Sequence, residues 1–436
     1  MKKETLAAGE GARGAAQDIL SDVLRKRRPL DAATEEELAH AKLSPRDAGF
    51  ARAISHETLR RFGQLDALIR TFVAKLPVPH RAGPTIEILL AGACELLFLD
   101  VAPHAAVDGA NRLAAADDKA VHFKPLINAA LRRISREGKD VLAAQDAERL
   151  SAPDWLWQRW CDAYGEDTAR TIARAHLAQP PLDILGVDEL ASLQTLPGAL
   201  VLPGGTVRLR DQGRIDELPG YGEGRWWVQD FAASLPARLL GDVKGATVID
   251  LCAAPGGKTA QLAAAGANVI AVEREASRVA TLKTNLERLK ISADIVEMDL
   301  RDYTPEKPAP FVLLDAPCSA TGTVRRHPDL PWMKSAADIV ACADGAHELL
   351  DAAAGMVAEN GVLVFAVCSL EPEEGVEQVA HFLRRHPEFQ REPVAPSDVF
   401  GLEELISVNG DLRTLPSHLS DQGGMDGFFA SRLRRV

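Results

Sequence analysis

The sequence contains few cysteines and lacks the cysteine pairs that bind structural metal ions. Its 436 residues include six cysteines, none of which forms a C-x-x-C pair, so we expect no structural zinc site. No H-E-x-x-H motif is present, because Arg60 stands where the second histidine after His56-Glu57 would be. The sequence therefore predicts reduced thiols, no metal ion and no metal-dependent catalysis.

Long hydrophobic runs are also absent. The first residues, Met1-Lys2-Lys3-Glu4, lack the apolar core of a signal peptide. The most apolar stretch, Ile86 to Asp100, is interrupted by Glu87 and Glu95 and is shorter than the ~20 residues that span a bilayer. We therefore expect a cytoplasmic protein without membrane segments.

The sequence also lacks an excess of positive charge. Fifty lysines and arginines stand against 62 acidic residues, for a net charge of −12. Any contact with nucleic acid must therefore come from local patches of positive charge. The apolar fraction of 46% and the charged fraction of 26% are typical of a globular protein and exclude a disordered chain.

The pattern of apolar residues predicts three regions. Residues 1–145 show helical spacing throughout, with Ser44-Pro45 as a helix start, and are expected to form an all-helical domain. Residues 146–225 contain few periodic elements and are expected to form a small mixed linker subdomain. Residues 226–436 alternate short β-runs with helical patterns, which predicts an α/β domain with a doubly wound, mostly parallel sheet. Its expected strands are 246–251, 268–272, 294–298, 311–314 and 361–366.

The first of these strands leads into a loop of small residues, Asp250-Leu251-Cys252-Ala253-Ala254-Pro255-Gly256-Gly257-Lys258-Thr259. Small residues let the backbone approach a ligand, and a helix start presents free N–H groups. A phosphate-binding P-loop would need glycine where Cys252 stands. The loop therefore predicts a ligand site of another kind, with a plain strand-to-helix turn as the alternative.

Acidic residues follow the next two strands. Glu273 ends the strand 268–272, about 20 residues after the glycine turn, where an acid can accept hydrogen bonds from ribose hydroxyls. Asp299 occupies the same kind of position after the strand 294–298. Ligands of parallel sheets bind at this edge, so both carboxylates are candidate binding residues.

Two cysteines stand at the ends of expected strands. Cys318 belongs to the segment Asp315-Ala316-Pro317-Cys318-Ser319, and Cys368 follows the strand 361–366. An isolated cysteine is usually a packing residue, which is the expectation for the remaining three, Cys94, Cys161 and Cys342. Two thiols at the ends of two neighbouring strands, beside Asp315, favour a reactive role over a structural one.

Together these motifs resemble those of the RNA cytosine-C5 methyltransferases of the Sun/Nol/Nop (RsmB-like) group. The loop 250–259 resembles the family's cofactor loop, and Asp315 to Ser319 resembles its first cysteine motif. Cys368-Ser369, followed by Glu373-Glu374, resembles the second. The entry segment and the C-terminal signature of the family resemble Val228-Gln229-Asp230 and Asp426-Gly427-Phe428-Phe429.

The helical region resembles a NusB-type RNA-binding domain. The resemblance rests on Glu95 to Asp100, Ala105-Ala106-Val107 and Asn128 to Arg133. Two positions depart from the methyltransferase pattern. Val367 replaces a usual threonine before the second cysteine, and Asp183 to Val187 lacks the usual Arg-x-Asn after Pro180-Pro181.

The resemblance implies a class I (Rossmann-like) methyltransferase domain that uses S-adenosyl-L-methionine to methylate C5 of a cytosine in RNA, with small-subunit ribosomal RNA as the expected substrate. Cys368 is implied as the nucleophile that adds to C6, Cys318 as the group that helps to release the product, and Asp315 as a hydrogen-bonding partner of the cytosine. The implied cofactor-binding residues are Cys252, Ala253, Ala254, Pro255, Gly256, Gly257, Lys258, Glu273, Asp299 and Asp315. Lys258 could instead contact a carboxylate or the RNA, or serve only as a charge at the start of a helix.

Local positive charge follows the first cysteine motif. Arg325, Arg326 and His327 are expected to contact RNA near a base that has left its stack, with a solvated charged loop as the alternative. Arg132-Arg133 and the run Arg25 to Arg28 are further candidates. The tryptophans could stack on bases, but they are expected to pack between subdomains: Trp155, Trp157, Trp160, Trp226 and Trp227.

Other functions remain open from the sequence. A tRNA or DNA cytosine methyltransferase would share the fold, although Cys368 argues against the DNA enzymes, whose nucleophile is the Pro-Cys cysteine. A non-catalytic RNA-binding or assembly factor would not need both Cys318 and Cys368. Neither domain shows a long apolar repeat, so a monomer is expected, with RNA as its partner.

Overall fold

The computed structural model describes residues 9–186, 190–210 and 213–436, which form two compact units. The helical unit comprises the chain up to Ala178 together with Val324–Lys334, and the α/β unit comprises Gln179–Thr323 and Ser335–Val436. The boundary coincides with the break at Gln179-Pro180-Pro181. The region 146–225, expected to form a subdomain of its own, is divided between the two units. The first eight residues of the expected helical domain and Val187 lie outside the described residues.

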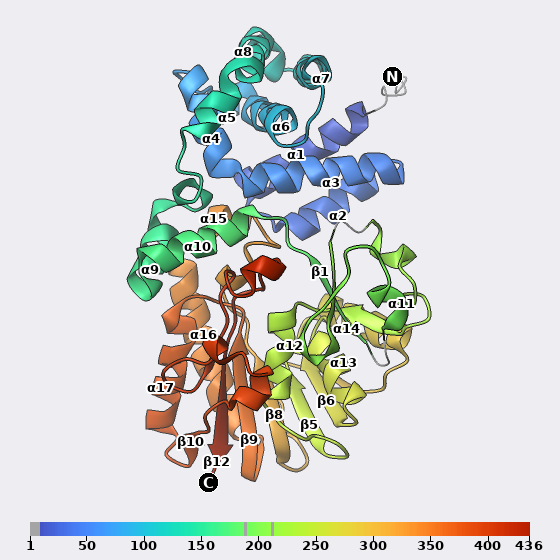
Figure 1. Ribbon diagram of the computed structural model, residues 1–436, viewed down its shortest axis with the longest axis vertical. Helices are drawn as coiled ribbons and strands as arrows, with labels where there is room; N and C mark the ends of the chain where they lie inside the picture. Colours follow the sequence, from blue (N-terminus) through green and yellow to red (C-terminus); the bar gives the residue numbers. More distant parts are fainter. Residues whose placement is uncertain (1–8, 187–189, 211–212) are drawn as a thin grey trace. The chain divides into compact units, whose positions relative to one another are not determined.

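The helical unit consists of helices joined by short turns (Figure 1). They are α1 (Glu10–Lys26), α2 (Leu30–Ala41), α3 (Pro45–Arg60), α4 (Phe62–Phe72), α5 (Pro79–Ala82), α6 (Thr85–Leu97), α7 (Pro103–Ala116), α8 (Lys124–Ala143), α9 (Asp154–Tyr164), α10 (Glu166–Leu177) and α15 (Leu330–Met333). Helix α3 begins as expected, because the Ser44 side chain accepts a hydrogen bond from Asp47 N at 3.2 Å and Pro45 stands in the first turn. None of the described helices is long and apolar enough to cross a membrane.

Helix α6 lies at the centre of the helical unit because it is apolar on nearly all sides. Almost all of its residues are buried, including Cys94. Its two acidic residues are paired with arginines of α1: Glu95 Oε2 lies 2.6 Å from Arg13 Nη2, and Glu87 pairs with Arg25. The apolar stretch that is too short for a membrane is therefore the core helix of a globular unit.

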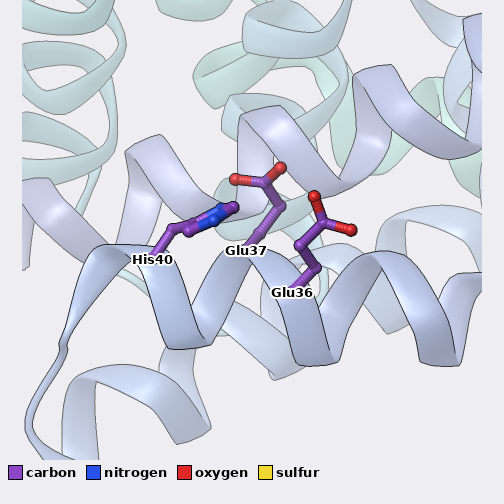
Figure 2. Close-up of side chains that lie close together, drawn as sticks. All are labelled: Glu36, Glu37 and His40. Carbon is purple, nitrogen blue, oxygen red and sulfur yellow. The ribbon is translucent and has the colours of Figure 1, made fainter.

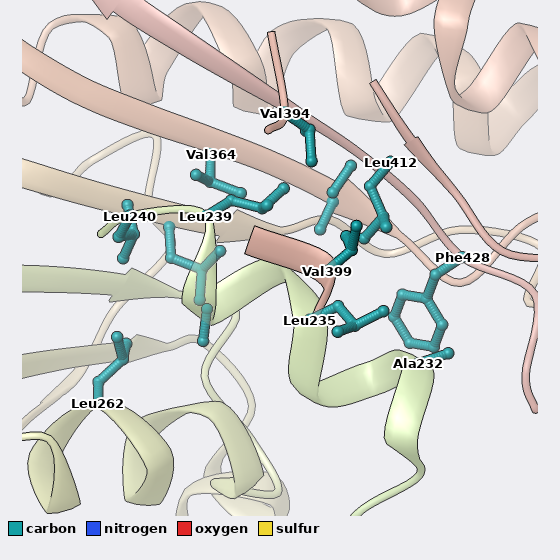
Figure 3. Packing of buried hydrophobic residues seen from close by; sticks show 14 of the residues in the cluster. Ala232, Leu235, Leu239, Leu240, Leu262, Val364, Val394, Val399, Leu412 and Phe428 are labelled. Carbon is teal, nitrogen blue, oxygen red and sulfur yellow. The ribbon is translucent and has the colours of Figure 1, made fainter. Parts of the chain in front are cut away.

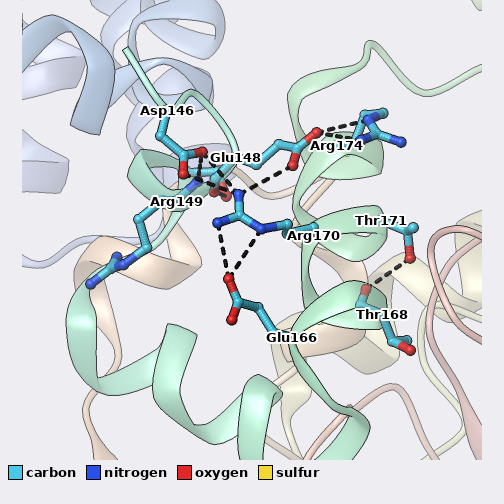
Figure 4. Close-up of polar contacts among 9 residues, drawn as sticks. Asp146, Glu148, Arg149, Glu166, Thr168, Arg170, Thr171 and Arg174 are labelled. Atoms are coloured by element: carbon cyan, nitrogen blue, oxygen red, sulfur yellow. Dashed lines mark hydrogen bonds and ion pairs between the residues drawn. The ribbon is translucent and has the colours of Figure 1, made fainter.

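An ion-pair network fixes α10 to the segment that precedes α9. Arg170 lies between three carboxylates, with Nη1 3.0 Å from Asp146 Oδ2 and Nη2 3.0 Å from Glu166 Oε1 (Figure 4). Its Nη1 also lies 3.6 Å from Glu148, which pairs with Arg174 at 2.6 Å. These contacts extend the helical unit past residue 145.

A small antiparallel sheet opens the α/β unit. Its strands are β1 (Leu182–Gly186), β2 (Leu200–Val201), β3 (Val207–Leu209) and β4 (Trp226–Val228), in the order β2-β3-β1-β4, with the short helix α11 (Ala191–Gln194) between β1 and β2. Strands of two to five residues give too little alternation for a sequence pattern, which is why this sheet was not expected. Trp226 and Trp227 of β4 are buried, as are Trp157 and Trp160 of α9, whereas Trp155 is partly exposed. Their packing between subdomains stays a prediction.

The main sheet has the order β10-β12-β9-β8-β5-β6-β7, with β11 paired to β12. Five strands are parallel and match the expected ones: β5 (Thr247–Leu251), β6 (Asn268–Glu273), β7 (Asp294–Glu297), β8 (Ala309–Asp315) and β9 (Val357–Val367). The structure adds an antiparallel edge that was not expected: β10 (Phe389–Arg391), β11 (Leu412–Arg413) and β12 (Phe429–Arg435). The helices of this unit are α12 (Phe231–Arg238), α13 (Gly257–Ala264), α14 (Ala276–Leu289), α16 (Ala336–Ala354) and α17 (Val376–Arg385).

Successive residues of the central strands pack on opposite faces of the sheet. In β9, Val362 and Val364 join a core with Leu235 of α12 and Leu262 of α13 (Figure 3). The intervening Leu363 and Phe365 join a second core with residues of α16 and α17. Both faces are therefore covered by helices, as expected for a doubly wound sheet.

Candidate active site

The parallel register brings the predicted motifs to one edge of the main sheet. Leu251 at the end of β5 pairs with Val272 of β6 and with Leu314 of β8, and Asp315 pairs with Ala366 of β9. The residues that follow these strands therefore meet at the same edge, where ligands of such sheets bind.

The two cysteines predicted to be reactive lie side by side. Cys318 Sγ is 3.5 Å from Cys368 Sγ, and both are free cysteines whose residues are partly buried. Their loops are joined through Gly322, whose N–H donates to the Cys368 carbonyl at 3.0 Å. A Cβ at Gly322 would lie 1.9 Å from the Gly427 carbonyl oxygen, so only glycine fits here. The C-terminal segment that carries Gly427 thus packs directly on the cysteine loops.

Asp315 contacts the lysine of the small-residue loop. Lys258 Nζ lies 2.8 Å from Asp315 Oδ2, and the lysine side chain is largely buried. Burial lowers the pKa of Lys258, but the charge and the hydrogen bond of Asp315 outweigh it, so that the pKa is raised and the ammonium form is favoured. Lys258 also interacts electrostatically with Cys368. Of the roles left open by the sequence, the structure shows the contact with a carboxylate, and Lys258 is also the second residue of α13.

The two thiols have different surroundings. The pKa of Cys318 is raised by its hydrogen bond with Cys368, by burial and by the negative charge of Glu374. A cation, Lys258, is the charged neighbour of Cys368. The two cysteines therefore have charged neighbours of opposite sign.

Glu374 is a residue of this site whose role the sequence did not indicate beyond its place in a motif. It is fully buried at the end of a 3₁₀ turn, Pro372–Glu374. Its Oε1 accepts a hydrogen bond from Ser319 N at 2.7 Å, and its Oε2 accepts from Ser319 Oγ at 2.5 Å and from Ser369 Oγ. A motif of consecutive acids gives no signal that one of them turns into the core.

A pocket lies beside the thiols at the ends of β6 and β7. Three of the predicted cofactor residues line it, Cys252, Glu273 and Asp299, together with Met298 and Pro317. Glu273 is buried and accepts hydrogen bonds from Arg274 N at 3.0 Å and Ala254 N at 3.4 Å. The hydrogen bond from Arg301, outweighing partial burial, lowers the pKa of Asp299 to about 2. Glu275, Arg274 and Arg278 also line the pocket, which therefore combines three carboxylates and two arginines with apolar residues.

The loop that precedes α13 is shaped to come close to a ligand. Cys252 has a positive φ of 59° and Gly256 one of 104°, and a Cβ at Gly256 would meet Leu282 Cδ1 at 2.7 Å. Burial raises the pKa of Cys252 to about 12, so this third thiol stays protonated. The buried Ala254 and the exposed Pro255 are tied to α14, because their carbonyls accept hydrogen bonds from Arg278 and Asn285. Ala253 is also buried, and Gly257 begins α13.

A buried polar atom lies under this loop. Thr259 Oγ1 donates to Asp250 Oδ2 at 2.6 Å, whereas Asp250 Oδ1 has no hydrogen-bond partner among the described residues. Burial raises the pKa of Asp250 to about 7. The site thus holds one acceptor whose partner is not within the described chain, as expected where a polar ligand binds.

Of the three basic residues predicted to contact RNA after the first cysteine motif, Arg325 is buried, whereas Arg326 and His327 are partly exposed and stay candidates. Arg325 is only 1% exposed, and its carbonyl accepts a hydrogen bond from Arg60 at 2.7 Å. His327 Nδ1 lies 3.3 Å from Asp31 Oδ2, and Arg326 is partly buried. Arg325 is buried because the whole segment 324–334 packs into the helical unit.

Three potential metal-ligating side chains meet on the surface of α2. The ligand atoms of Glu36, Glu37 and His40 lie within 4.8 Å of one another (Figure 2). Glu36 is exposed and pairs with Arg28, so its charge is already balanced. Exposed groups of this kind occur commonly without an ion, and this one is remote in sequence from the motifs above.

Both units match known protein families. The family model of the 16S rRNA methyltransferase RsmB/F matches residues 237–434, and that of the NusB family matches residues 10–136. Ribosomal RNA small subunit methyltransferase B of Pseudomonas putida is 34% identical, covering 97% of this chain and 98% of its own length. The protein of the same name from Pasteurella multocida is 32% identical over 100% of this chain and 98% of its own.

Solved structures share the fold. The crystal structure of PH0851 has a TM-score of 0.78 at 23% identity and covers 100% of both chains. The structure of NSun6 from Pyrococcus horikoshii with SFG has a TM-score of 0.55 at 20% identity, covering 65% of this chain and 98% of that one. The expected fold class is thus confirmed. With relatives above 30% identity along nearly its whole length, the chain belongs to the RsmB/F family of S-adenosylmethionine-dependent 16S rRNA methyltransferases and carries a NusB family domain in its helical unit.

Proposed function

We propose that this protein methylates C5 of a cytosine in 16S rRNA through a transient bond between Cys368 and C6 of the base. The observation that carries the assignment of roles is the 3.5 Å separation of the Cys318 and Cys368 sulfur atoms beside the Lys258–Asp315 pair. Cysteine is the strongest nucleophile among the side chains at this edge.

The residues at the pocket fit S-adenosyl-L-methionine, which supplies an electrophilic methyl group when it is bound. Glu273 and Asp299 offer carboxylate oxygens to ribose hydroxyls and to the adenine end. The narrow loop from Cys252 to Lys258 lets the backbone approach the ligand. These residues bind and orient the cofactor, and none of them needs to react with it.

The thiol of Cys368 adds to C6 of the flipped base, which makes C5 nucleophilic. Lys258, held by Asp315, is the cation that interacts with Cys368. We assign to Asp315 the hydrogen bond with the N3 and amino edge of the cytosine. After methyl transfer a base accepts the C5 proton, the electron pair of that C–H bond re-forms the C5–C6 double bond, and the Cys368 sulfur leaves with the electrons of the C6–S bond. We assign to Cys318, in contact with the Cys368 sulfur, the task of assisting this release.

The test uses labelled S-adenosyl-L-methionine and small-subunit rRNA that lacks its cytosine methylation. Wild type is compared with Cys368→Ala and Cys318→Ala, and with Cys161→Ala on α9 as a matched control outside the site. We expect wild type and the control to label C5 of a cytosine. Cys368→Ala should be inactive, and Cys318→Ala should accumulate a covalent RNA adduct on denaturing gels.

The other outcomes decide against parts of the proposal. Methylation by Cys368→Ala would make Cys318 the nucleophile. Transfer to tRNA and none to rRNA would preserve the chemistry and replace the substrate. Transfer to neither RNA, with cofactor binding intact, would leave an RNA-binding or assembly role.

A further inference from the structure

The two cysteines of the candidate active site lie on segments that run side by side. Before the cysteines, Ala316 N donates to the Ala366 carbonyl at 2.9 Å. After them, Ser319 Oγ lies 3.3 Å from Ser369 Oγ. Neighbouring backbone segments of a sheet are about 4.8 Å apart, which is within the range of about 4.4–6.8 Å over which a disulfide joins two Cα atoms. The backbone spacing at this point therefore suits a disulfide between the two cysteines.

The two sulfur atoms are already in contact. Cys318 Sγ lies 3.5 Å from Cys368 Sγ, and both cysteines are free. A disulfide bond is about 2.05 Å long, so the sulfur atoms need to approach each other by about 1.5 Å. Rotation of the two side chains can cover this distance without a change of fold.

Hydrogen bonds beyond the cysteines hold the two segments together. Glu374 accepts from Ser319 N at 2.7 Å and from the Ser369 hydroxyl, and Gly322 N donates to the Cys368 carbonyl at 3.0 Å. With links on both sides, the two thiols are kept close to each other. A reaction between them is therefore intramolecular and proceeds at a high effective concentration.

A small oxidant can reach the pair. Cys318 and Cys368 are only partly buried, and the neighbouring Pro317 is exposed and lines the pocket at the ends of β6 and β7. Hydrogen peroxide is little larger than water. Cys94, in contrast, is fully buried in α6, where the oxidant has no such access.

We propose that Cys318 and Cys368 form a redox modification site, at which a peroxide converts the two thiols into a disulfide and a dithiol reductant restores them. The first sulfur to react attacks one oxygen of the peroxide, the O–O bond breaks, and a sulfenic acid and one water are formed. The second sulfur attacks the sulfenic sulfur, and the hydroxyl group leaves with the thiol proton as a second water. The two electrons that the thiols lose are those that reduce the peroxide. Dithiothreitol reverses the change by thiol–disulfide exchange and is itself oxidised.

The disulfide would occupy both thiols to which the proposed function assigns roles, so the linked protein should not transfer methyl groups. This consequence rests on the proposed function. The disulfide itself is a property of the protein alone, and it can be measured without RNA or cofactor.

The experiment treats the full-length protein with hydrogen peroxide at about pH 8, where thiols begin to ionise. Free thiols are then blocked with N-ethylmaleimide, and linked peptides are identified by mass spectrometry without reduction. Trypsin leaves Cys342 and Cys368 on one peptide, so a glutamate-specific protease is added to cut between them at Glu359. We expect one linkage, between Cys318 and Cys368, together with a loss of nearly all methyl transfer that dithiothreitol restores.

Single-cysteine variants test the intermediate. In Cys318→Ser and in Cys368→Ser the remaining thiol has no partner, so its oxidation should stop at the sulfenic acid, which dimedone labels. Wild type should take up at least about tenfold less dimedone, because the second thiol closes the disulfide first. Cys161→Ala, on α9 in the helical unit, is the matched control and should form the same disulfide as wild type.

Several results would overturn the proposal. One is a wild-type protein that loses methyl transfer in peroxide while Cys318 and Cys368 stay unlinked, and another is a linkage of either residue to a different cysteine. Equal dimedone labelling of wild type and the single-cysteine variants would refute the intramolecular closure, and inactivation that dithiothreitol does not reverse would refute its reversibility. A reduced protein that methylates no RNA but still forms the disulfide would instead refute the proposed function and leave this inference standing.

Discussion

The pair of Arg208 and Asp183 gives the sharpest prediction about stability. Both side chains are fully buried, and the guanidinium binds the carboxylate through two contacts, Nε to Oδ1 at 2.6 Å and Nη2 to Oδ2 at 2.7 Å. Arg208 Nη1 also donates to the carbonyls of Gln422 at 3.1 Å and Gly424 at 2.7 Å, and Phe231 N donates to Asp183 at 3.0 Å. The pair therefore joins the small sheet to α12 and to the C-terminal segment.

Replacing Arg208 by methionine should destabilise the α/β unit strongly. Methionine fills much of the volume of the arginine side chain. Asp183, however, is left as a buried carboxylate without its cation, which should lower the free energy of unfolding by about 3–5 kcal/mol. The single replacement Asp183→Leu leaves a buried guanidinium and should cost a similar amount. The double replacement removes both charges, so it should cost no more than either single one, since the uncompensated charge is the main penalty.

The assay is hydrogen exchange at increasing urea, followed by mass spectrometry. Peptides from β1 and β3 report on the α/β unit, and peptides from α1 and α6 serve as an internal reference within the same molecule. The reasoning would be refuted if Arg208→Met lowered the free energy of unfolding of the α/β unit by less than about 1 kcal/mol, the net contribution of an ordinary neutral hydrogen bond. It would also be refuted if the double variant lost as much unfolding free energy as the two single variants together.

Three further predictions concern other buried groups. Arg13→Ala leaves Glu95 of α6 unpaired in the core and should lower the free energy of unfolding of the helical unit by about 3–5 kcal/mol, as followed by urea denaturation. Gly322→Ala forces its Cβ against the Gly427 carbonyl and should reduce methyl transfer by about a hundredfold with cofactor affinity retained in calorimetry; equal activity would show that the loop can move. Burial raises the pKa of Asp250 to about 7, so the folded state holds its proton more tightly than the unfolded state does. Stability should therefore fall as pH rises from about 4 to about 7, and Asp250→Asn should show a flatter profile in the same denaturation assay.

The parallel part of the fold could be predicted because its strands are apolar and its helices regular. The expected strand 268–272 became β6, with Glu273 at its end, and the loop 250–259 became the turn into α13. Cys318 and Cys368 could be placed together from sequence because parallel strands end at one edge of the sheet. These are local signals combined with a general rule of topology.

The rest depends on contacts that a sequence pattern does not contain. The strand β12 pairs with β9 across more than sixty residues of chain, and no periodicity reveals that pairing. Glu374 is turned into the core by the serines of two separate loops. Arg325 looked like a solvent-facing cation, yet the segment around it also carries Pro328, Leu330 and Trp332, whose apolar character was the available sign of burial.

The segment 324–334 has a consequence for the order in which the protein is made. It leaves the α/β unit directly after Thr323 and packs into the helical unit. There Asp329 accepts from Leu30 N at 3.0 Å and Trp332 donates to the Leu59 carbonyl at 3.1 Å. The helical unit comes first in the chain, yet its packing cannot be complete until the ribosome has released Lys334. A nascent chain that ends at Ala178 would lack the segment that packs against Leu30 and Leu59. We therefore expect the helical unit to complete its folding only after much of the α/β unit has been synthesised.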